Sequence, residues 1–281
     1  MSVETHILVL GATGKTGRRV MERLQARNIR VRAGSRSGQP PFDWENRDTW
    51  GPALAGISAV YIAYQPDLAV PAAEADIQAL TELAAANGVQ RLVLLSGRGE
   101  DEAERCEQVV QQSGLEWTIV RASWFSQNFS ESFLIDAVLA GEVVLPVGDI
   151  LEPFIDADDI ADVAVAALTE DGHAAQLYEV TGPRLLSFDE AVAEIGKATG
   201  RDIQFIPVSA EDYNAGLRAA GVPEDYLWLL NYLFTTVMDG RNAYLTDGVQ
   251  RALGRSPKDF VEYARETAAA GVWQVKTADH A

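Results

Sequence analysis

A glycine-rich run near the start of the chain, Gly11-Ala-Thr-Gly14-Lys-Thr-Gly17, is the segment best suited to chemistry. It follows a short apolar segment, residues 6–10, and precedes a segment of helical character. The first glycine permits a tight turn, the second lets a diphosphate approach the backbone, and the third allows close packing of a helix on a strand. Free amides and the helix dipole attract an anion there. The pattern predicts a dinucleotide site made by Gly11, Ala12, Thr13, Gly14, Lys15, Thr16 and Gly17. A purely structural turn is the alternative interpretation.

The end of the next expected strand, residues 29–33, bears on which dinucleotide binds. NAD sites usually place Asp or Glu ~20 residues beyond the glycine loop, where the acid holds the ribose 2′-hydroxyl. Here the sequence reads Arg32-Ala-Gly-Ser35-Arg36 and contains no acid. A guanidinium can hold a 2′-phosphate and stack on adenine. Ser35 and Arg36 therefore predict NADP, with NADPH as the reduced form, and Lys15 or Arg32 in support. A solvated basic loop is the alternative.

Strands and helices are expected to alternate from residue 6 to residue 121. The expected strands are 6–10, 29–33, 42–44, 59–63, 91–95 and 117–121, and the expected helices are 14–25, a segment from Pro71 to Asn87, and 100–113. Such alternation predicts a parallel sheet with helical crossovers. We therefore expect an α/β fold, a Rossmann doubly wound parallel sheet.

The second half of the chain is less regular. A helix is expected over 158–168, a strand over 177–180, and a helix opened by a Ser187–Glu190 capping box that ends near Gly200. A final helix is expected to start at Ser256-Pro257. We predict an NADP-binding Rossmann domain over 1–150, its sheet continued by 151–182, and a small, mostly helical substrate lobe over 183–281.

The composition of the chain limits the kinds of partner that it is expected to bind. The 281 residues include 23 basic and 41 acidic side chains, a net charge of −18, and one cysteine. This charge argues against nucleic acid, which selects basic surfaces. Cys106 alone forms no intramolecular disulfide or thiolate metal cluster, and no apolar stretch approaches the ~18–20 residues of a membrane span. Asp156-Ala-Asp158-Asp159 lies where a helix begins, which favours a capping role. We expect a cytoplasmic protein without a metal, a nucleic-acid partner or a membrane partner.

Several motifs together resemble the NmrA-like branch of atypical short-chain dehydrogenases. They are the glycine loop, Ser35-Arg36-Ser37 and Arg121-Ala-Ser-Trp-Phe125-Ser-Gln-Asn128-Phe129. Phe42-Asp-Trp44 and the segment 182–189 make the chain similar to clavine-alkaloid reductases, azoreductase-like and quinone-reductase-like proteins in that branch. The resemblance covers nearly the whole chain. It implies nicotinamide contacts from Ala63, Tyr64, Ser96, Ser123 and Phe125. Tyr64 and Ser96 are the candidate catalytic residues, and mere lining of the pocket is the alternative.

The sequence departs from ordinary short-chain dehydrogenases at their usual catalytic pair. Ordinary short-chain dehydrogenases use a Tyr-x-x-x-Lys pair, which would fall just before Glu107, where this sequence has Gly99 and Ala103. Ketone reduction needs a positioned acid, whereas hydride delivery to an iminium carbon depends mainly on geometry. We therefore expect an NADPH-dependent reductase of an imine, quinone, azo or similar conjugated small molecule, aromatic or polycyclic. A non-catalytic NADP(H)-binding sensor or regulator is the alternative. The aromatic segment 226–234 is either core packing or a lid over such a substrate.

Overall fold

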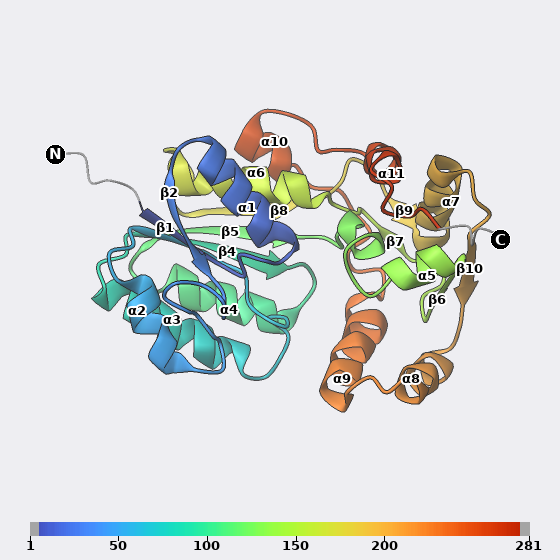
Figure 1. Ribbon diagram of the computed structural model, residues 1–281, viewed down its shortest axis with the longest axis horizontal. Helices are drawn as coiled ribbons and strands as arrows, with labels where there is room; N and C mark the ends of the chain where they lie inside the picture. The colour runs from blue at the N-terminus through green and yellow to red at the C-terminus, as the bar shows by residue number, and fades with distance from the viewer. Residues whose placement is uncertain (1–5, 276–281) are drawn as a thin grey trace, which may run out of the picture. The chain divides into compact units, whose positions relative to one another are not determined.

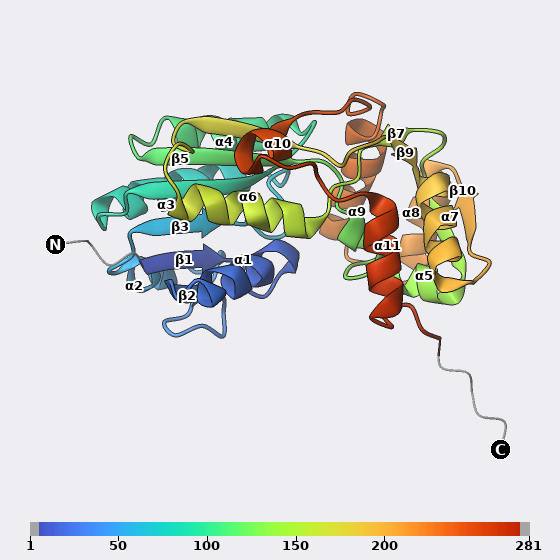
Figure 2. The same ribbon diagram turned by 90° about the horizontal axis from the view of Figure 1, so that it is seen from above.

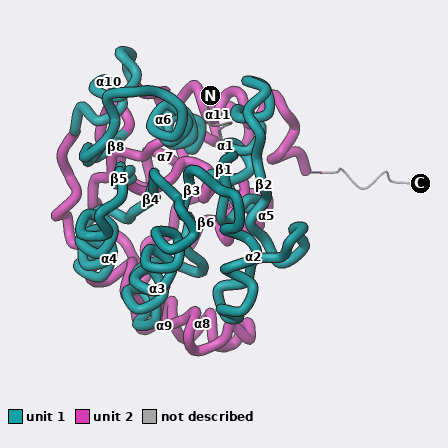
Figure 3. The backbone as a smooth tube through the Cα atoms, turned by 90° about the vertical axis from the view of Figure 1, so that its left-hand side faces the viewer, with its two compact units in different colours: residues 1–122, 157–181, 246–256 teal, residues 123–156, 182–245, 257–281 magenta. Residues whose placement is uncertain are grey.

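The computed structural model describes residues 6–275, which form two compact units (Figure 3). The first unit contains residues 6–122, 157–181 and 246–256, and the second contains 123–156, 182–245 and 257–275. The division therefore differs from the predicted boundaries at 150 and 183. The chain leaves the first unit at the end of a sheet strand, returns to it twice, and so interleaves the two units along the sequence. That one unit binds cofactor and the other substrate stays a prediction.

The first unit is built on a six-stranded parallel sheet (Figure 1). Its strands, in the order β2-β1-β3-β4-β5-β8, are Arg30–Gly34, His6–Leu10, Ala59–Ile62, Arg91–Gly97, Glu116–Ala122 and Gln176–Val180. The residues of β3 and most of β1 and β4 are buried, as expected for strands covered on both faces. The predicted α/β class with a Rossmann-like parallel sheet is confirmed.

Helices cover both faces of this sheet (Figure 2). They are α1 Lys15–Ala26, α2 Trp50–Leu54, α3 Ala73–Ala86, α4 Asp101–Gln111, α6 Ala157–Thr169 and α10 Gly248–Leu253, with a short 3-10 helix, Arg47–Thr49, before α2. α1, α6 and α10 lie on one face and α2, α3 and α4 on the other. On the second face, Leu8, Val60 and Leu92 join one buried apolar cluster with the helices. No helix within residues 6–275 is long and apolar enough to cross a membrane.

Helices α1 and α6 are joined by ion pairs. The Arg23 guanidinium lies 2.9 Å from Asp158 and 2.5 Å from Asp162, and Arg19 lies 3.1 Å from Asp158. Asp158, which was predicted to cap α6, therefore also pairs with arginines of the neighbouring helix. Among residues 6–275, no group of three or more His, Cys, Asp or Glu is placed to hold a metal ion.

The second unit combines short helices with two small sheets. Its elements are η2 Ser126–Phe129, α5 Ile135–Ala140, β6 Glu142–Leu145, β7 Leu151–Glu152, β9 Leu186–Ser187, α7 Phe188–Thr199, β10 Gln204–Pro207, α8 Ala210–Ala219, α9 Glu224–Tyr232, the π-helical turn η3 Leu233–Val237, and α11 Phe260–Ala269. β10 pairs with β6 in parallel, and β7 with β9 antiparallel. Phe129, Phe154, Phe188 and Phe260 meet in its core. The predicted capping box is confirmed, because Ser187 and Glu190 exchange both hydrogen bonds.

Two predicted elements were wrong. No strand forms over 42–44; instead Phe42 and Trp44 pack edge to face against each other at 4.9 Å and on Trp50, and only an isolated bridge joins Asp43 to Asn46. The final helix begins at Phe260, not at Pro257. Its cap is Asp259, whose carboxylate accepts a hydrogen bond from the Val261 amide at 2.8 Å.

Candidate functional site

The glycine loop joins β1 to α1 by close backbone contacts. Gly11 has a left-handed φ of +67°, donates its amide to the Gly34 carbonyl at 3.1 Å, and accepts from the Gly14 amide at 2.9 Å. A Cβ on Gly17 would lie 2.1 Å from the Gly11 carbonyl oxygen. A Cβ on Gly11 would lie 3.1 Å from that of Ala63. Glycine is therefore required at the first and last positions for the loop to close over the helix.

The start of α1 offers an anion site. Gly14 is the N-cap, no side chain caps the helix, and its first turn carries no acid. Thr13 is exposed and Lys15 partly exposed, whereas the buried Thr16 hydroxyl accepts a hydrogen bond from Tyr61 at 2.9 Å. First-turn amides lack partners within a helix, so an uncapped start favours a bound phosphate. The residues present therefore fit a diphosphate, with Thr16 contributing its main chain.

At the end of β2, two predicted arginines have different surroundings. Arg36 is exposed, and within residues 6–275 no hydrogen bond or ion pair engages its side chain. Ser35 is partly buried, with its hydroxyl 3.3 Å from that of Ser37. Arg32 instead donates to the carbonyls of Ala53 and Ala55 at 2.7 and 2.8 Å, where α2 ends. Arg32 is thus held partly by main-chain carbonyls, whereas Arg36 is exposed; the roles of both arginines at a 2′-phosphate stay predictions.

At the end of β3, Ala63 and Tyr64 are both buried. The Tyr64 hydroxyl donates to Asp76 at 2.8 Å, and Asp76 also pairs with Arg47 at 2.7 Å. Burial, with the adjacent carboxylate, raises the pKa of Tyr64. Its ring packs 4.6 Å from Trp44. The hydroxyl thus has a fixed acceptor, and Trp44 belongs to an aromatic cluster.

At the end of β4, Ser96 is 4% exposed and donates to Glu107 of α4 at 2.5 Å. Glu107 is also buried and accepts from the Arg121 guanidinium at 2.8 Å. Arg98 pairs with Glu179 of β8 at 2.6 Å. These bonds tie together the carboxyl ends of β4, β5 and β8. Both candidate catalytic hydroxyls, of Tyr64 and Ser96, therefore donate to carboxylates.

Two carboxyl groups that the sequence analysis overlooked meet at the same edge. Asp67 follows β3, Glu100 follows β4, and each buried carboxyl group shifts the pKa of the other. Burial, and secondarily the Asp67 charge, raises the pKa of Glu100 well above its usual range. Burial also raises the pKa of Asp67. Parallel strands place ligands beyond their carboxyl ends; applying that rule to acids as well as hydroxyls would have found this pair.

The remaining predicted residues, Ser123 and Phe125, belong to the second unit. The Ser123 hydroxyl donates to the Pro153 carbonyl at 2.6 Å, and Phe125 forms a bridge with Ile155. Trp124 between them packs on Phe234 at 5.4 Å. This motif therefore supports the core of the second unit. The structure brings the glycine loop, Ser35, Arg36, Ala63, Tyr64 and Ser96 to the carboxyl edge of one sheet.

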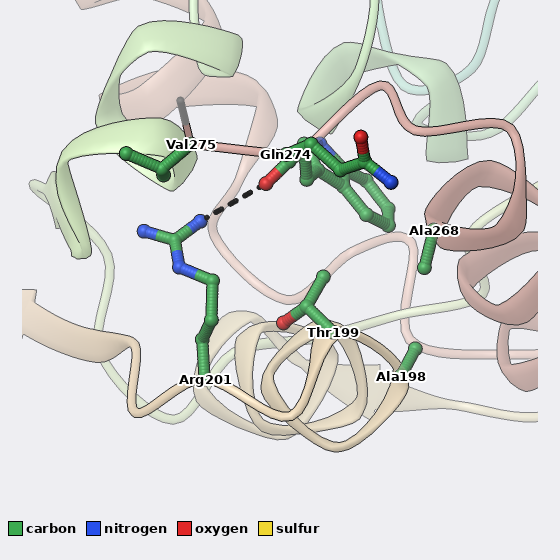
Figure 4. Close-up of a pocket in the computed structure, with 7 residues that line it drawn as sticks. Ala198, Thr199, Arg201, Ala268, Gln274 and Val275 are labelled. Atoms are coloured by element: carbon green, nitrogen blue, oxygen red, sulfur yellow. Dashed lines mark hydrogen bonds between the residues drawn. The ribbon is translucent and has the colours of Figure 1, made fainter. Parts of the chain in front are cut away.

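The second unit also contains a pocket of about 360 Å³ (Figure 4). It is lined by Ala198, Thr199, Arg201, Ala268, Trp273, Gln274 and Val275. Arg201 donates to the Trp273 carbonyl at 3.4 Å and to the Leu139 carbonyl at 2.7 Å, so its guanidinium holds main chain. None of the predicted site residues lines this pocket.

Comparison with known families agrees with the loop geometry. The sequence model described as NAD(P)H-binding matches residues 11–171. The chain belongs to this NAD(P)H-binding family. The matched segment begins at Gly11, the first glycine of the glycine loop, and includes the rest of that loop together with Arg36, Tyr64 and Ser96. The predicted nicotinamide dinucleotide cofactor is confirmed at the level of the family.

Relatives of this NAD(P)H-binding protein cover nearly its whole length. It is 30% identical to "Prestalk A differentiation protein A" of Dictyostelium discoideum, over 95% of this chain and 93% of that one. It is 30% identical to an NAD(P)H azoreductase of Xenophilus azovorans, over 94% and 98%. It is 31% identical to a festuclavine dehydrogenase of Aspergillus fumigatus, over 92% and 97%. The predicted resemblance to azoreductases and clavine reductases is confirmed.

Solved structures of NAD(P)H-binding proteins share the fold. Triphenylmethane reductase from Citrobacter sp., complexed with NADP(H), matches with a TM-score of 0.75 and 20% identity, over 94% of this chain and 99% of that one. The NADPH-dependent quinone oxidoreductase of Escherichia coli, complexed with NADPH, matches with a TM-score of 0.75 and 21% identity, over 92% and 99%. At this identity the likeness shows a common fold.

Proposed function

We propose that the protein is an NADPH-dependent reductase that delivers hydride to an imine, quinone, azo or similar conjugated small molecule. The observation that carries the proposal is a glycine-closed, uncapped helix start beside a strand end that has an exposed arginine and no acid. The first feature fits a diphosphate, and the second fits a 2′-phosphate rather than a free ribose hydroxyl.

The roles divide along the sheet edge. Main-chain atoms of Gly11, Ala12, Thr13, Gly14, Lys15, Thr16 and Gly17 hold the diphosphate. Ser35 and Arg36 hold the 2′-phosphate, while Ala63, Tyr64 and Ser96 line the reaction site. When bound, NADPH supplies the hydride. Ser123 and Phe125 stay predictions of nicotinamide contacts.

The substrate class is supported by chemistry and by the relatives. The segment 97–105 has neither Tyr nor Lys, so the usual proton-donating pair has no residues there. The relatives include a named azoreductase and a named festuclavine dehydrogenase. A net charge of −18 attracts cationic substrates such as iminium ions. We propose an aromatic or polycyclic acceptor and, from the single buried cysteine, a reducing cytoplasmic setting.

Stopped-flow mixing with NADPH and a panel of cyclic imines, quinones and azo dyes tests this function. We expect the absorbance of the reduced nicotinamide to decay with at least one acceptor, and more slowly with NADH than with NADPH. An absorbance that stays constant with every acceptor would refute the reductase function.

A cofactor-dependent sensor is the second candidate. Two observations favour it: the hydroxyls of Tyr64 and Ser96 are already bonded to carboxylates, and one relative is named as a differentiation protein. Calorimetry that showed a large difference in affinity between NADP⁺ and NADPH, with no turnover, would support the sensor over the reductase.

A further inference from the structure

The Asp67–Glu100 pair has no role in the proposed cofactor contacts. Asp67 lies in the loop after β3 and accepts the Ala69 amide at 2.9 Å. Glu100 directly precedes α4 and is 7% exposed. One of its carboxyl oxygens, Oε2, has no hydrogen-bond partner within the described chain. Buried polar atoms normally have a partner, so a buried carboxyl oxygen that accepts from no donor is consistent with a protonated carboxyl group.

The backbone holds the Glu100 carboxyl in place. A Cβ on Gly97 would lie 2.1 Å from Glu100 Oε1 and 2.7 Å from Oε2, so the carboxyl group rests directly on the glycine at the end of β4. Any larger residue at 97 would displace it. At the end of β4, the sequence Ser96-Gly97 therefore places a hydroxyl group next to the glycine against which the Glu100 carboxyl group packs.

The surroundings of the pair are acidic. The groups that act on Glu100 are Asp67, from the loop after β3, and Glu102 and Glu107, both on α4. Two carboxyl groups can hydrogen-bond only if one of them carries a proton. The Ala69 amide favours charge on Asp67, and burial raises the pKa of Glu100, so a proton shared by the two groups would lie on Glu100.

We propose that Glu100 is the general acid of this reductase and that Asp67 is the positioning residue that keeps it in place. This inference rests on the proposed function. NADPH, when bound, would supply a hydride with its electron pair to the electrophilic carbon or nitrogen of the acceptor. The Glu100 O–H bond breaks, and its proton forms a new bond to the acceptor's oxygen or nitrogen. Glu100 is left as a carboxylate and is reprotonated by water.

The location supports this assignment. The pair lies beyond β3 and β4, at the sheet edge that also carries the glycine loop. The two candidate catalytic hydroxyls there, of Tyr64 and Ser96, are weaker acids than a carboxyl group, and each donates to a carboxylate that also pairs with an arginine, Arg47 or Arg121. Glu100 combines a raised pKa with a buried carboxyl oxygen, Oε2, that accepts from no donor, as expected for a protonated carboxyl group. The acid thus takes the place of the missing Tyr-x-x-x-Lys pair.

Two acceptors separate acid catalysis from structural damage. Menadione needs a proton when it accepts hydride, whereas N-methyl-3,4-dihydroisoquinolinium does not. We expect Glu100→Gln to lower kcat with menadione about 100-fold, the scale of general acid catalysis. With the iminium ion, kcat should stay within about twofold of wild type. Asp101→Asn, which changes the exposed neighbouring acid, should leave both rates unchanged. Equal losses on both acceptors, or none on menadione, would overturn the assignment.

Infrared spectroscopy tests the pair without turnover. At pH 7 the wild type should show the C=O band of a protonated carboxyl group, which shifts in D₂O, disappears in Glu100→Gln and persists in Asp101→Asn. Asp67→Asn should keep the band but move it, which provides a second variant if Glu100→Gln does not fold. A wild type without the band overturns the inference, whatever the enzyme reduces. A wild type that has the band but reduces no acceptor would refute the proposed function and, with it, the acid's role.

Discussion

The end of β2 and the ends of β3 and β4 lie on the same sheet edge, yet they are built in opposite ways. Arg36 after β2 is exposed, cationic and unengaged within residues 6–275. At or beyond the ends of the other two strands, Tyr64 and Ser96 are buried and donate to carboxylates, and Glu100 is buried beside other acids. An exposed cation selects an anion at little cost to the fold. Buried acids cost stability but fix where a proton resides. We therefore expect the end of β2 to recognise the cofactor and the ends of β3 and β4 to hold and supply the proton.

The largest effect should come from adding a side chain at Gly17 in the glycine loop, which lies at the same sheet edge as both regions. Gly17→Ala places a methyl group 2.1 Å from the Gly11 carbonyl oxygen. We expect NADPH binding to become undetectable and the free energy of unfolding to fall by about 1–3 kcal/mol. Calorimetry and thermal unfolding measure the two. Gly51→Ala, where nothing lies within 4 Å, should leave both unchanged. Tight NADPH binding by Gly17→Ala would mean that the loop is only a turn.

Reversing the charge at the β2 end should change cofactor choice. With Arg36→Glu we expect the Kd of NADPH to rise about 10–100-fold, because a charge-assisted contact worth ~1.5–3 kcal/mol is lost. The Kd of NADH should be nearly unchanged. Fluorescence titration with both cofactors measures the ratio. Arg265→Glu, an exposed arginine of α11, is the matched control. If Arg36→Glu leaves the preference for NADPH over NADH unaltered, the end of β2 does not select the cofactor and does not differ in this way from the ends of β3 and β4.

The pH dependence of the Tm should reveal the raised pKa of the buried Glu100. The pKa of Glu100 is raised by folding, so its favourable contribution is complete below the unfolded value of ~4.3 and is lost as pH rises through the folded value. Above that value the fold must hold two adjacent carboxylates. We expect the Tm of wild type to fall by about 3 °C relative to Glu100→Gln between pH 6 and pH 9. Differential scanning fluorimetry tests this; parallel Tm curves would contradict it.

The smallest effect should follow Tyr64→Phe. The hydroxyl donates to Asp76, so its loss should cost about 1 kcal/mol of folding free energy. Because its pKa is raised and its proton already has an acceptor, menadione reduction should slow by less than about threefold. Steady-state kinetics and chemical denaturation measure both. A loss near 100-fold would make Tyr64 the acid instead of Glu100.

The parallel sheet and the glycine loop were predictable because their signals are local. Apolar runs such as 6–10 and 91–95 and the spacing of Gly11, Gly14 and Gly17 determine strand, loop and helix within a few residues. The capping box at Ser187 was equally readable, since its partners are three residues apart. Unit 1 was therefore largely accessible from the sequence.

Long-range contacts account for what was missed. The Asp67–Glu100 pair joins two loops more than thirty residues apart, and only the adjacency of β3 and β4 brings them together. The hydrogen bonds of Arg32 to the carbonyls of Ala53 and Ala55 were not predictable either, because they depend on where α2 packs. The short strands β6, β7 and β10 were likewise invisible, since each has a single partner strand distant in sequence.

The arginine contacts between α1 and α6 have a consequence for ligand affinity. Arg23 bridges Asp158 and Asp162, one turn apart on α6, so α1 cannot slide or rotate about its axis without breaking both ion pairs. The amides at its first turn are thereby oriented before any phosphate arrives. The helix therefore loses less conformational freedom when the nucleotide binds. Weakening the ion pairs of Arg23 should lower nucleotide affinity, although Arg23 lies more than a full helical turn from the first-turn amides.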